Sequence, residues 1–330
     1  MLYRLTIRSR SSQELRQLAR ERRALADSQE TRLKSLLLHE ARLLESYADL
    51  RDWIARPGSS AGPADASKGS AQAAPVRDSH HAPPRAPAGS GLLASHVAAR
   101  LGLEPADQQA LFAAAVPRHV LQGEHLSEDG ETPSSLSILC SGLAKATRVL
   151  ADGTEQITAI FVPGDMVNAG DLTFRRSRSA VVALTSAIAL SVPVTALRRL
   201  MEERPSIARA LWRETAAQAA ILQEWMTGLG SRTAESRLAH FLCEMFCRLR
   251  PSQPDNGDGV DLPLTQRELS EILGLSVVHV NRVLQRLRSA GLIEFNRARL
   301  VITDKAGLYA VAEFDPAYLG DFVPSNAGSR

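Results

Sequence analysis

Apolar residues recur every three or four positions through residues 264–287, in two runs that a glycine separates. These positions are Leu269, Leu273, Leu275, Val280, Val283 and Leu287. The spacing places apolar side chains on one face of each of two short helices and leaves the other face of the second helix to solvent. Gly274 lies between the runs, where a left-handed backbone costs glycine little, and the small Ser270 lets two helices cross closely. The pattern predicts a helix-turn-helix, whose second helix fits the major groove of DNA.

Polar residues at the helix ends and the segment that follows support this interpretation. Thr265 and Glu268 have the spacing of a capping box, and Ser276 is placed to cap the second helix. After Gly291 the residues LIEFNRARLVIT alternate as two short strands about a turn at residues 296–298. A helix-turn-helix followed by a β-hairpin is a winged helix. An αα-hairpin without a DNA function has the same apolar spacing, so the helical motif alone leaves that alternative open.

Upstream, short apolar runs separated by Gly, Asp and Pro predict a β-domain. After a helical patch at residues 92–115 come runs at residues 116–121, 136–150, 156–162 and 178–194. Asp152-Gly153 between two of these runs is a two-residue hairpin signal. Several short strands at close spacing are typical of a small β-barrel or jelly roll.

A long helical pattern begins at Pro205 and continues to about residue 229. Its apolar or small residues are Ala208, Leu211, Thr215, Leu222, Trp225 and Leu229. Such a stripe can pack on its own barrel or pair with the same helix of a second chain, and a heptad repeat of this length favours pairing. Recognition of two DNA half-sites would also require a dimer. We therefore expect a dimerisation helix with its seam on Leu211, Leu222, Trp225 and Leu229.

The composition is that of a multidomain protein without a membrane or secretory segment. The 330 residues are 44% hydrophobic, enough for two or more cores. The formal net charge of +3 allows contact with nucleic acid without requiring it. The 3 cysteines argue against a disulfide framework, and no apolar run reaches the roughly 18 residues of a membrane helix. We therefore expect a cytoplasmic protein with no membrane partner.

Residues 1–91 differ in amino-acid composition from the rest of the chain. Residues 1–56 are rich in arginine and leucine and predict a basic helical extension of unknown role. Residues 57–91 are dominated by Ala, Pro, Gly and Ser, which bury too little apolar surface to offset the entropy of ordering, so a disordered linker is expected. The adjacent His80 and His81 lie in this linker, and we expect no metal site there.

The order of jelly roll, long helix and winged helix resembles the Crp/Fnr family of bacterial transcription regulators. The resemblance covers residues 92–315 and is most specific in SGLAKATRVLADGTEQITAIFVPGD at 141–165, in SRTAESRLAHFLCEMF at 231–246, and in the winged helix. It implies an α+β fold with a cyclic-nucleotide-binding-like β jelly roll, a long dimerisation helix and a C-terminal winged helix-turn-helix. It also implies a homodimer without enzyme activity that binds double-stranded DNA at a palindromic operator and contacts RNA polymerase.

The predicted domain boundaries follow this order. Residues 92–203 form the sensor barrel, residues 204–230 the dimerisation helix and residues 231–318 the winged-helix domain. Residues 319–330 are expected to be a flexible tail. Residues 1–91 have no counterpart in the family pattern.

Within the winged helix, Arg282 matches the recognition-helix arginine that reads guanine in this family, and a guanidinium can donate two hydrogen bonds to guanine O6 and N7. Val278 stands where many relatives carry a glutamate. It cannot accept from an amino group but can contact a thymine methyl, so the operator should differ at that base pair. Asn281 and His279 complete the predicted base-reading set. Contacts to the DNA backbone are expected from Thr265, Gln266, Arg267, Ser276, Gln285 and Arg286.

The cyclic-nucleotide site of the family is incomplete in this sequence. Arg178 and Ser179 match its phosphate-binding pair, and a guanidinium with a hydroxyl suits a phosphate. The glutamate that holds the ribose does not align, because Asn168 and Ala169 stand in the place of its Gly-Glu and Asp171 lies two residues later. We expect no cofactor, keep a cyclic nucleotide at Arg178, Ser179 and Asp171 as the alternative, and leave the effector open.

Two other sensors and two other functions remain alternatives. Cys243 and Cys247 lie four residues apart on a predicted helix and could be oxidised together, while haem ligation by His119 or His125 has no spacing in its favour. An architectural protein with little sequence preference would use the basic N-terminal segment for phosphate contacts. A cupin-like metal enzyme would need a His/Glu cluster in the barrel, where the histidines are scattered.

Overall fold

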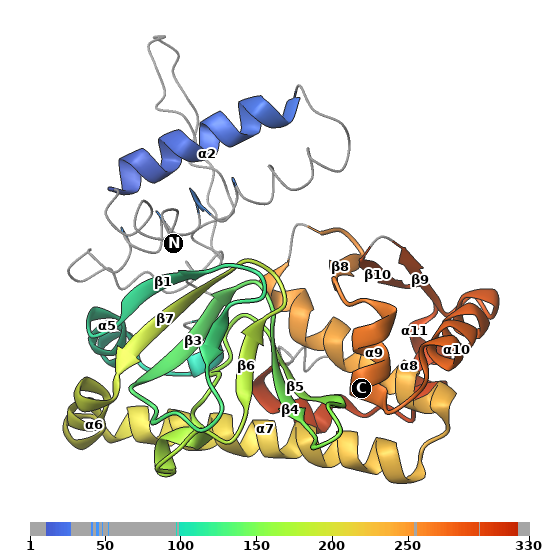
Figure 1. Cartoon of the computed structure of the whole chain (residues 1–330). Helices are drawn as coiled ribbons and strands as arrows, with labels where there is room; N and C mark the ends of the chain where they lie inside the picture. The colour runs from blue at the N-terminus through green and yellow to red at the C-terminus, as the bar shows by residue number, and fades with distance from the viewer. Residues whose placement is uncertain are drawn as a thin grey trace, which may run out of the picture.

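The computed structural model describes residues 11–27, 41, 44, 45, 48, 52, 97 and 99–322, apart from 254, 255 and 297. Figure 1 shows a β-barrel beside a mostly helical C-terminal domain, with one long helix, α7, running along both. The linker predicted at residues 57–91, with His80 and His81, lies outside the described residues, as do residues 323–330 of the predicted tail. Among the helices described, none combines the length and the apolar character needed to cross a bilayer.

The barrel consists of two antiparallel sheets, one of order β1-β7-β3 and one of order β2-β6-β4-β5. The strands are β1 (Val116–Val120), β2 (His125–Ser127), β3 (Ser135–Ser141), β4 (Ala144–Val149), β5 (Glu155–Phe161), β6 (Ala180–Ala183) and β7 (Ala187–Pro193). Side chains from both sheets, such as Leu139 of β3, Phe161 of β5 and Val181 of β6, form one buried apolar cluster. Strands distant in sequence are neighbours in each sheet, which confirms the jelly roll that the short apolar runs predict.

The β4–β5 hairpin turns through a longer loop than its Asp152-Gly153 sequence predicts. The Leu150 amide donates to the Thr154 carbonyl at 2.9 Å, and the Gly153 amide donates to the Leu150 carbonyl at 2.9 Å. Residues 151–153 therefore form a three-residue loop, with Gly153 at a positive φ of 84°. The prediction of a two-residue turn was wrong because a left-handed glycine closes a three-residue loop equally well.

One helix comes directly before the strands of the barrel in the sequence, and another comes directly after them. Helix α5 (Pro105–Ala113) precedes β1 and buries Leu111 and Phe112, while α6 (Val194–Glu203) follows β7. In the N-terminal extension, α2 (Ser12–Asp27) buries Leu15 in the same apolar cluster as Phe112. Arg16 of α2 pairs with Asp52 at 2.6 Å. The predicted helical extension therefore contains a helix at residues 12–27.

Helix α7 (Pro205–Ser231) has 27 residues, a length of about 40 Å at 1.5 Å per residue, and it has two distinct faces. The buried residues of one face are Ile207, Ala210, Glu214, Ile221 and Gly228. The large apolar side chains exposed on another face are Trp212, Leu222, Met226 and Leu229. Trp212 is 75% exposed and Met226 66% exposed. We call these four residues the exposed seam of α7.

Only two of the four residues predicted for the dimerisation seam are exposed on α7. Leu222 and Leu229 are exposed, but Leu211 packs partly buried against the barrel core. Trp225 turns into its own chain, where its indole Nε1 donates to Glu244 at 2.9 Å. Trp212 and Met226, which the sequence pattern did not single out, are exposed beside Leu222 and Leu229. Periodicity could not separate the faces because α7 carries apolar side chains on both of them.

The C-terminal domain contains the predicted winged helix and one strand more. Its elements are α8 (Ala234–Leu249), η2 (Arg250–Ser252), β8 (Gly259–Asp261), α9 (Gln266–Leu273), α10 (Val277–Ser289), β9 (Ile293–Asn296), β10 (Arg299–Ile302), α11 (Lys305–Ala312) and η3 (Pro316–Phe322). Helices α9 and α10 form the helix-turn-helix, and β9 and β10 form the wing. Strand β8 completes an antiparallel sheet of order β8-β10-β9. The sequence pattern missed β8 because its 3 residues are too few for alternation to be visible.

The barrel and the C-terminal domain share one hydrophobic core. Ile157 and Ile160 of the barrel belong to the same buried cluster as Leu242 and Val280 of the C-terminal domain. Helix α9 lies against strand β5, where the Gln156 side-chain amide donates to the Glu271 carbonyl at 2.5 Å. The helix-turn-helix is therefore held against the barrel rather than suspended on a linker.

Candidate DNA interface and sensor cavity

The first helix of the helix-turn-helix is capped at both ends by the residues that the sequence predicts. Thr265 Oγ1 accepts from the Glu268 amide at 3.1 Å, and Glu268 Oε2 accepts from the Thr265 amide at 2.8 Å, which completes the capping box. At the other end Gly274 has a left-handed φ of 61°. A Cβ at Gly274 would lie 3.1 Å from Leu229 Cδ2, so close packing against α7 also favours glycine there.

Helix α10 buries one face and presents the other to solvent. Ser276 caps its N-terminus by accepting from the His279 amide at 3.2 Å. The buried side chains are Val280, Val283, Leu284 and Leu287. Arg282 is exposed and Val278 is 69% exposed, while His279 and Asn281 are half-buried on either side of them. The four residues predicted to read bases therefore lie together on one side of one helix.

Arg282 differs from the neighbouring arginines in its contacts. Within the described part of the chain it makes no hydrogen bond or ion pair. Arg267 pairs with Glu271 at 2.9 Å, and Arg286 pairs with Glu235 at 3.5 Å. An exposed guanidinium without such a contact keeps its planar set of donors for a bidentate acceptor.

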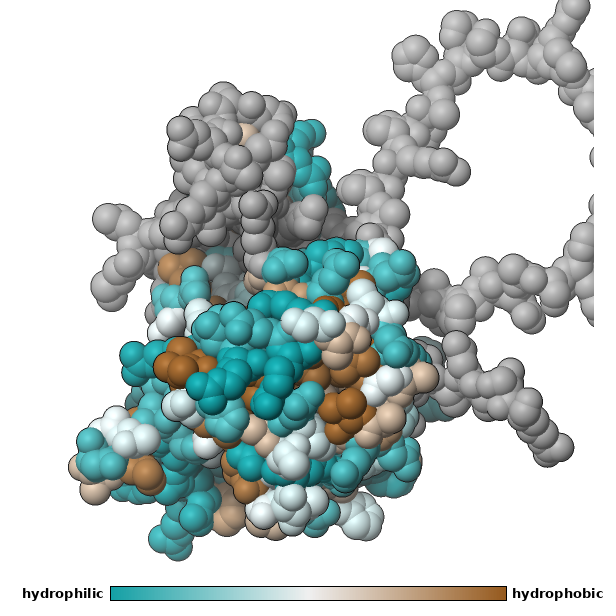
Figure 2. Space-filling model, turned by 90° about the vertical axis from the view of Figure 1, so that its right-hand side faces the viewer, coloured by the Kyte–Doolittle hydropathy of each residue, from teal (hydrophilic) through white to brown (hydrophobic). Residues whose placement is uncertain are grey.

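The side of the molecule that carries α10 is polar over much of its area. Figure 2 shows hydrophilic residues across the middle of this side, with separate apolar patches between them. All six residues predicted to contact the DNA backbone are exposed. They are Thr265, Gln266, Arg267, Ser276, Gln285 and Arg286. The exposed Val277 and Val278 on α10 account for apolar surface on this otherwise polar helix face.

A cavity of about 270 Å³ lies between the barrel and α7. Its walls come from β4, β5, the loop that holds η1 (Gly170–Thr173), and α7. The polar side chains in its lining are Thr158, Asn168, Asp171, Ser179, Thr215, Gln218 and Arg248. Asp171 and Ser179, two of the three residues predicted for an effector pocket, line this cavity. The third, Arg178, is not in the lining, and its guanidinium lies 5.6 Å from the centroid of the Phe174 ring.

The charged residues in the lining of this cavity already have partners within the protein. Arg248 is the cation among the described lining residues, and Asp165 and Glu244 already bind it. Asp171 faces the Arg178 amide and the Ser177 hydroxyl, and burial raises the pKa of its carboxyl. A phosphate in this cavity would have to compete with Asp165 and Glu244 for Arg248. The ribose hydroxyls would have to compete with the Arg178 amide and the Ser177 hydroxyl for the Asp171 carboxyl.

Sequence reasoning missed a buried charged cluster behind the cavity. Arg248 of α8 donates to Asp165 Oδ2 at 2.9 Å, to Glu244 Oε1 at 2.8 Å and to the Ile160 carbonyl at 2.8 Å. Glu244 also accepts from Trp225 Nε1 at 2.9 Å and from the Tyr318 hydroxyl at 3.1 Å. Glu244 and Arg248 are four residues apart on a mostly apolar helix, which was the signal available in the sequence.

The cluster extends to α7 through a second ion pair. Arg100 Nη2 lies 2.7 Å from Glu214 Oε2 and 4.0 Å from Asp165 Oδ1. Gln218 donates to Glu214 Oε1 at 2.8 Å and to the Met166 carbonyl at 3.1 Å. The side chains of the barrel, α7 and α8 are thus joined by buried polar contacts at the same place.

The cysteines lie in apolar surroundings. Cys140 and Cys243 are buried and Cys247 is half-buried, and burial raises the pKa of all three thiols. A raised pKa lowers the thiolate fraction on which oxidation depends, which argues against the redox alternative at Cys243 and Cys247. Over the part of the chain that the structure describes, His, Cys, Asp and Glu form no group of three or more suited to a metal ion.

Comparison with known protein families assigns both halves of this architecture. Residues 117–204 match the family model of the cyclic nucleotide-binding domain, and residues 236–311 match that of the Crp-like helix-turn-helix domain. Apart from Val116, the strands of the barrel fall within the first match, and helices α9 and α10 with the wing fall within the second.

Individual relatives agree with the family models. A probable transcriptional activator of Rhizobium leguminosarum bv. viciae is 30% identical over 185 residues, which are 56% of this chain and 76% of the relative. The transcriptional activator protein FnrA of Stutzerimonas stutzeri is 29% identical over 195 residues, 59% of this chain and 80% of the relative. The solved structure of FixK2 from Bradyrhizobium japonicum superposes with a TM-score of 0.54 at 25% identity, covering 60% of this chain and 96% of that one. The order of the domains, the capped helix-turn-helix and these similarities agree, and the chain belongs to the Crp/Fnr family of bacterial transcription regulators.

Proposed function

We propose that this regulator is a homodimer that binds a palindromic operator by inserting α10 of each protomer into the major groove. The observation that carries the proposal is Arg282, which is exposed on a capped helix and makes no hydrogen bond or ion pair within the described residues. A guanidinium in that position can donate two hydrogen bonds to guanine O6 and N7. The same helix is buried on its other side, so it can dock without refolding.

The exposed seam of α7 supports the dimer. Leu222, Met226 and Leu229 are separated by four and three residues, the spacing that coiled coils use, and Trp212 lies ten residues before Leu222, in the same heptad register. Large apolar side chains gathered on one helix face mark an interaction surface in soluble proteins. A second copy of α7 fits this seam because a two-fold axis places identical apolar residues against one another.

The remaining contacts follow from the position of each residue on the helix-turn-helix. Val278 contacts a thymine methyl, and His279 and Asn281 reach neighbouring base edges. The polar residues at the two helix N-termini and on the outer turn of α10 bind phosphates and set the register. These residues are Thr265, Gln266, Arg267, Ser276, Gln285 and Arg286.

The proposal also covers the effector that the regulator binds and its effect on transcription. The lining of the cavity between the barrel and α7 supports an effector other than a cyclic nucleotide, because its Arg248 and Asp171 are engaged within the protein. The names of the Rhizobium and Stutzerimonas relatives describe activators. We infer that this chain also activates transcription, through contact of the DNA-bound dimer with RNA polymerase.

Competitive DNA binding tests this function. Operators selected by the wild-type protein should contain two inverted half-sites, and Arg282→Ala should lose selectivity between operator and random DNA by about 5- to 150-fold per half-site. Sedimentation should show a dimer for both proteins, since Arg282 is not part of the exposed seam of α7. A wild-type protein without sequence preference would instead indicate the architectural alternative, and a monomer would contradict the proposal.

A further inference from the structure

The joint between α7 and α8 is short. Helix α7 ends at Ser231 and α8 begins at Ala234, so Arg232 and Thr233 alone connect them. Thr233 caps α8 by accepting from the Ser236 amide at 3.1 Å. The joint also adjoins the helix-turn-helix, because a small cavity of about 20 Å³ is lined by Gly228 and Leu229 of α7 and by Ile272 and Leu273 of α9.

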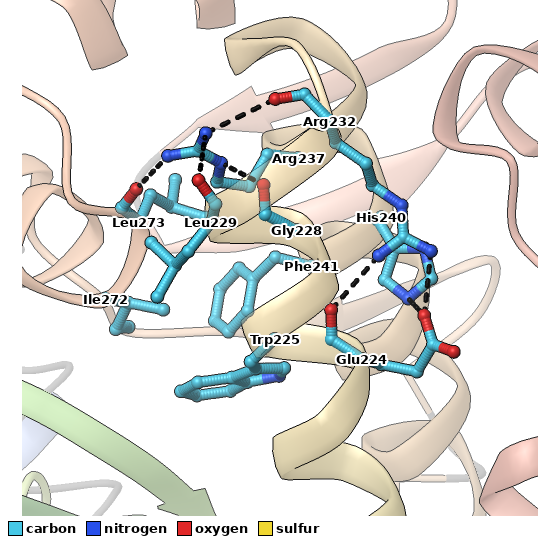
Figure 3. A pocket seen from close by; sticks show the side chains of 10 residues that line it. All are labelled: Glu224, Trp225, Gly228, Leu229, Arg232, Arg237, His240, Phe241, Ile272 and Leu273. Atoms are coloured by element: carbon cyan, nitrogen blue, oxygen red, sulfur yellow. Dashed lines mark hydrogen bonds and ion pairs between the residues drawn. The ribbon is translucent and has the colours of Figure 1, made fainter.

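One side chain bridges all three helices at this joint. Figure 3 shows the Arg237 guanidinium surrounded by four backbone carbonyls. Its Nε donates to Gly228 at 2.8 Å, and its Nη2 donates to Leu229 at 3.3 Å and to Arg232 at 3.2 Å. Its Nη1 donates to the Leu273 carbonyl at 2.7 Å. Arg237 belongs to α8. The Gly228 and Leu229 carbonyls lie at the C-terminal end of α7, the Arg232 carbonyl lies in the joint, and the Leu273 carbonyl belongs to the last residue of α9.

The chemistry of helix ends explains why an arginine stands there. The last four carbonyls of a helix lack partners within the helix and carry a partial negative charge. The C-terminal ends of α7 and α9 converge on this one cation, whose planar guanidinium donates in several directions at once. A lysine would supply the charge but only one compact group of donors.

Packing between α7 and α9 is close at the same point. Leu229 Cδ2 lies 3.1 Å from the position that a Cβ on Gly274 would occupy, and Gly274 is the turn between α9 and α10. The end of α7 therefore lies directly against the turn that aims the recognition helix. A change in the angle between α7 and α9 would move α10 by the same rotation.

We propose that Arg237 is a positioning residue that fixes the distance between the two recognition helices of the dimer and thereby sets the spacing of the operator half-sites. The proposal rests on the proposed dimer with α7 at its axis. One added base pair moves a half-site by about 3.4 Å and rotates it by about 35°. Only a rigid connection between the dimer axis and α10 can reject such a displaced half-site.

The test is a selection from operators that share identical half-sites but differ in their separation by single base pairs. The wild-type protein should prefer one separation over its neighbours by about tenfold or more, and Arg237→Gln should reduce that preference to about threefold or less while selecting the same half-site sequence. Arg232→Gln is the matched control. Arg232 lies in the same joint but binds Glu224 of α7, at 2.7 Å to Oε2 and 3.1 Å to the carbonyl, so its loss should leave the preferred separation unchanged.

Arg237→Lys keeps the inference testable if the glutamine variant does not fold. The lysine retains positive charge at both helix ends, so it should fold, yet it should still tolerate a displaced half-site. Wild-type spacing preference in every folded Arg237 variant would overturn the inference and leave the proposed function intact. A wild-type protein that binds all separations equally would overturn both, because it would contradict recognition of two half-sites by a rigid dimer.

Discussion

Arg248 of the DNA-binding domain lies 2.9 Å from Asp165 of the barrel, and their side chains are only 2% and 0% exposed. The same guanidinium binds Glu244 at 2.8 Å, so one buried cation faces two buried carboxylates. Charges removed from water in this way are tolerated only when each has a partner. The contact therefore makes the packing of the two domains against each other depend on charge balance as well as on their shared apolar core.

Removal of Arg248 should destabilise the whole chain. We expect Arg248→Met to lower the free energy of unfolding by about 3–5 kcal/mol, because two carboxylates stay buried without their cation. Urea denaturation measures this effect. Arg267→Gln is the control: its pair with Glu271 has an arginine that is 80% exposed, and such a surface pair contributes about 0–1 kcal/mol. Equal stability of the two variants would contradict the role of Arg248.

Glu214 should give the protein a stability that depends on pH. Burial and the nearby Asp165 outweigh Arg100 and raise the pKa of Glu214 from 4.5 to about 7. Because the folded state holds this proton more tightly than the unfolded state, the contribution of Glu214 is present below about pH 4.5 and is lost as the pH rises toward about 7. The free energy of unfolding of the wild type, relative to Glu214→Gln, should therefore fall over this range. Urea denaturation of both proteins between about pH 5 and about 8 measures the difference. A difference that stays constant or rises with pH would show that Arg100 keeps Glu214 ionised throughout.

Local signals in the sequence predicted the helix-turn-helix well. The capping box of Thr265 and Glu268, the cap at Ser276 and the left-handed Gly274 are decided by residues within four positions of one another, and the structure confirms all of them. The jelly roll was also predictable, because short apolar runs bounded by turn residues are typical of such barrels. These features need no knowledge of which distant segments meet.

Contacts between distant segments were not predictable in the same way. Trp225 looked like part of a dimer seam, but it packs against Phe241 of the same chain, with ring centroids 5.7 Å apart. Arg248 looked like an ordinary helix arginine, since only the fold brings it within 2.9 Å of Asp165. Arg237 has no sequence signal for its bond to Leu273, which is 36 residues away. In each case the sequence pattern indicates which side chains share a face of a helix. It does not indicate which distant segment of the chain packs against that face.

A charge placed in the exposed seam of α7 should separate the proposed dimer. Met226→Glu would put two carboxylates near the two-fold axis, and burying such a charge costs at least a few kcal/mol, so the dimer dissociation constant should rise by about 100-fold or more. Sedimentation equilibrium over a range of concentrations measures this constant. Gln223→Glu is the matched control for an added carboxylate, because Gln223 is an exposed polar residue of the same helix. A Met226→Glu protein that dimerises like the control would show that the dimer uses a different surface.

Cyclic AMP should not bind the cavity between the barrel and α7. At about 1 mM nucleotide, a site with a dissociation constant of about 10 µM would stabilise the protein by about 2.7 kcal/mol. We expect no such rise in thermal stability and no saturable heat in calorimetric titration, because Arg248 is engaged and Arg178 lies outside the lining. Saturable binding that Arg178→Ala abolishes would contradict this prediction, since Arg178 would then have to turn from Phe174 into the cavity.

Val278 should determine one base pair in each half-site of the operator. Its side chain is 69% exposed and stands one helical turn before Arg282, so both reach the same groove when α10 docks. An apolar side chain favours a thymine methyl, whereas a carboxylate accepts a hydrogen bond from the cytosine amino group. Val278→Glu should therefore change the selected base at that position, with a discrimination of about 1–3 kcal/mol, and leave the guanine read by Arg282 unchanged. Selection of operators from random DNA by both proteins measures the effect, and Val277→Glu is the control for the same substitution at an exposed neighbour on the same helix. Identical operators for the wild type and Val278→Glu would mean that Val278 does not approach the bases.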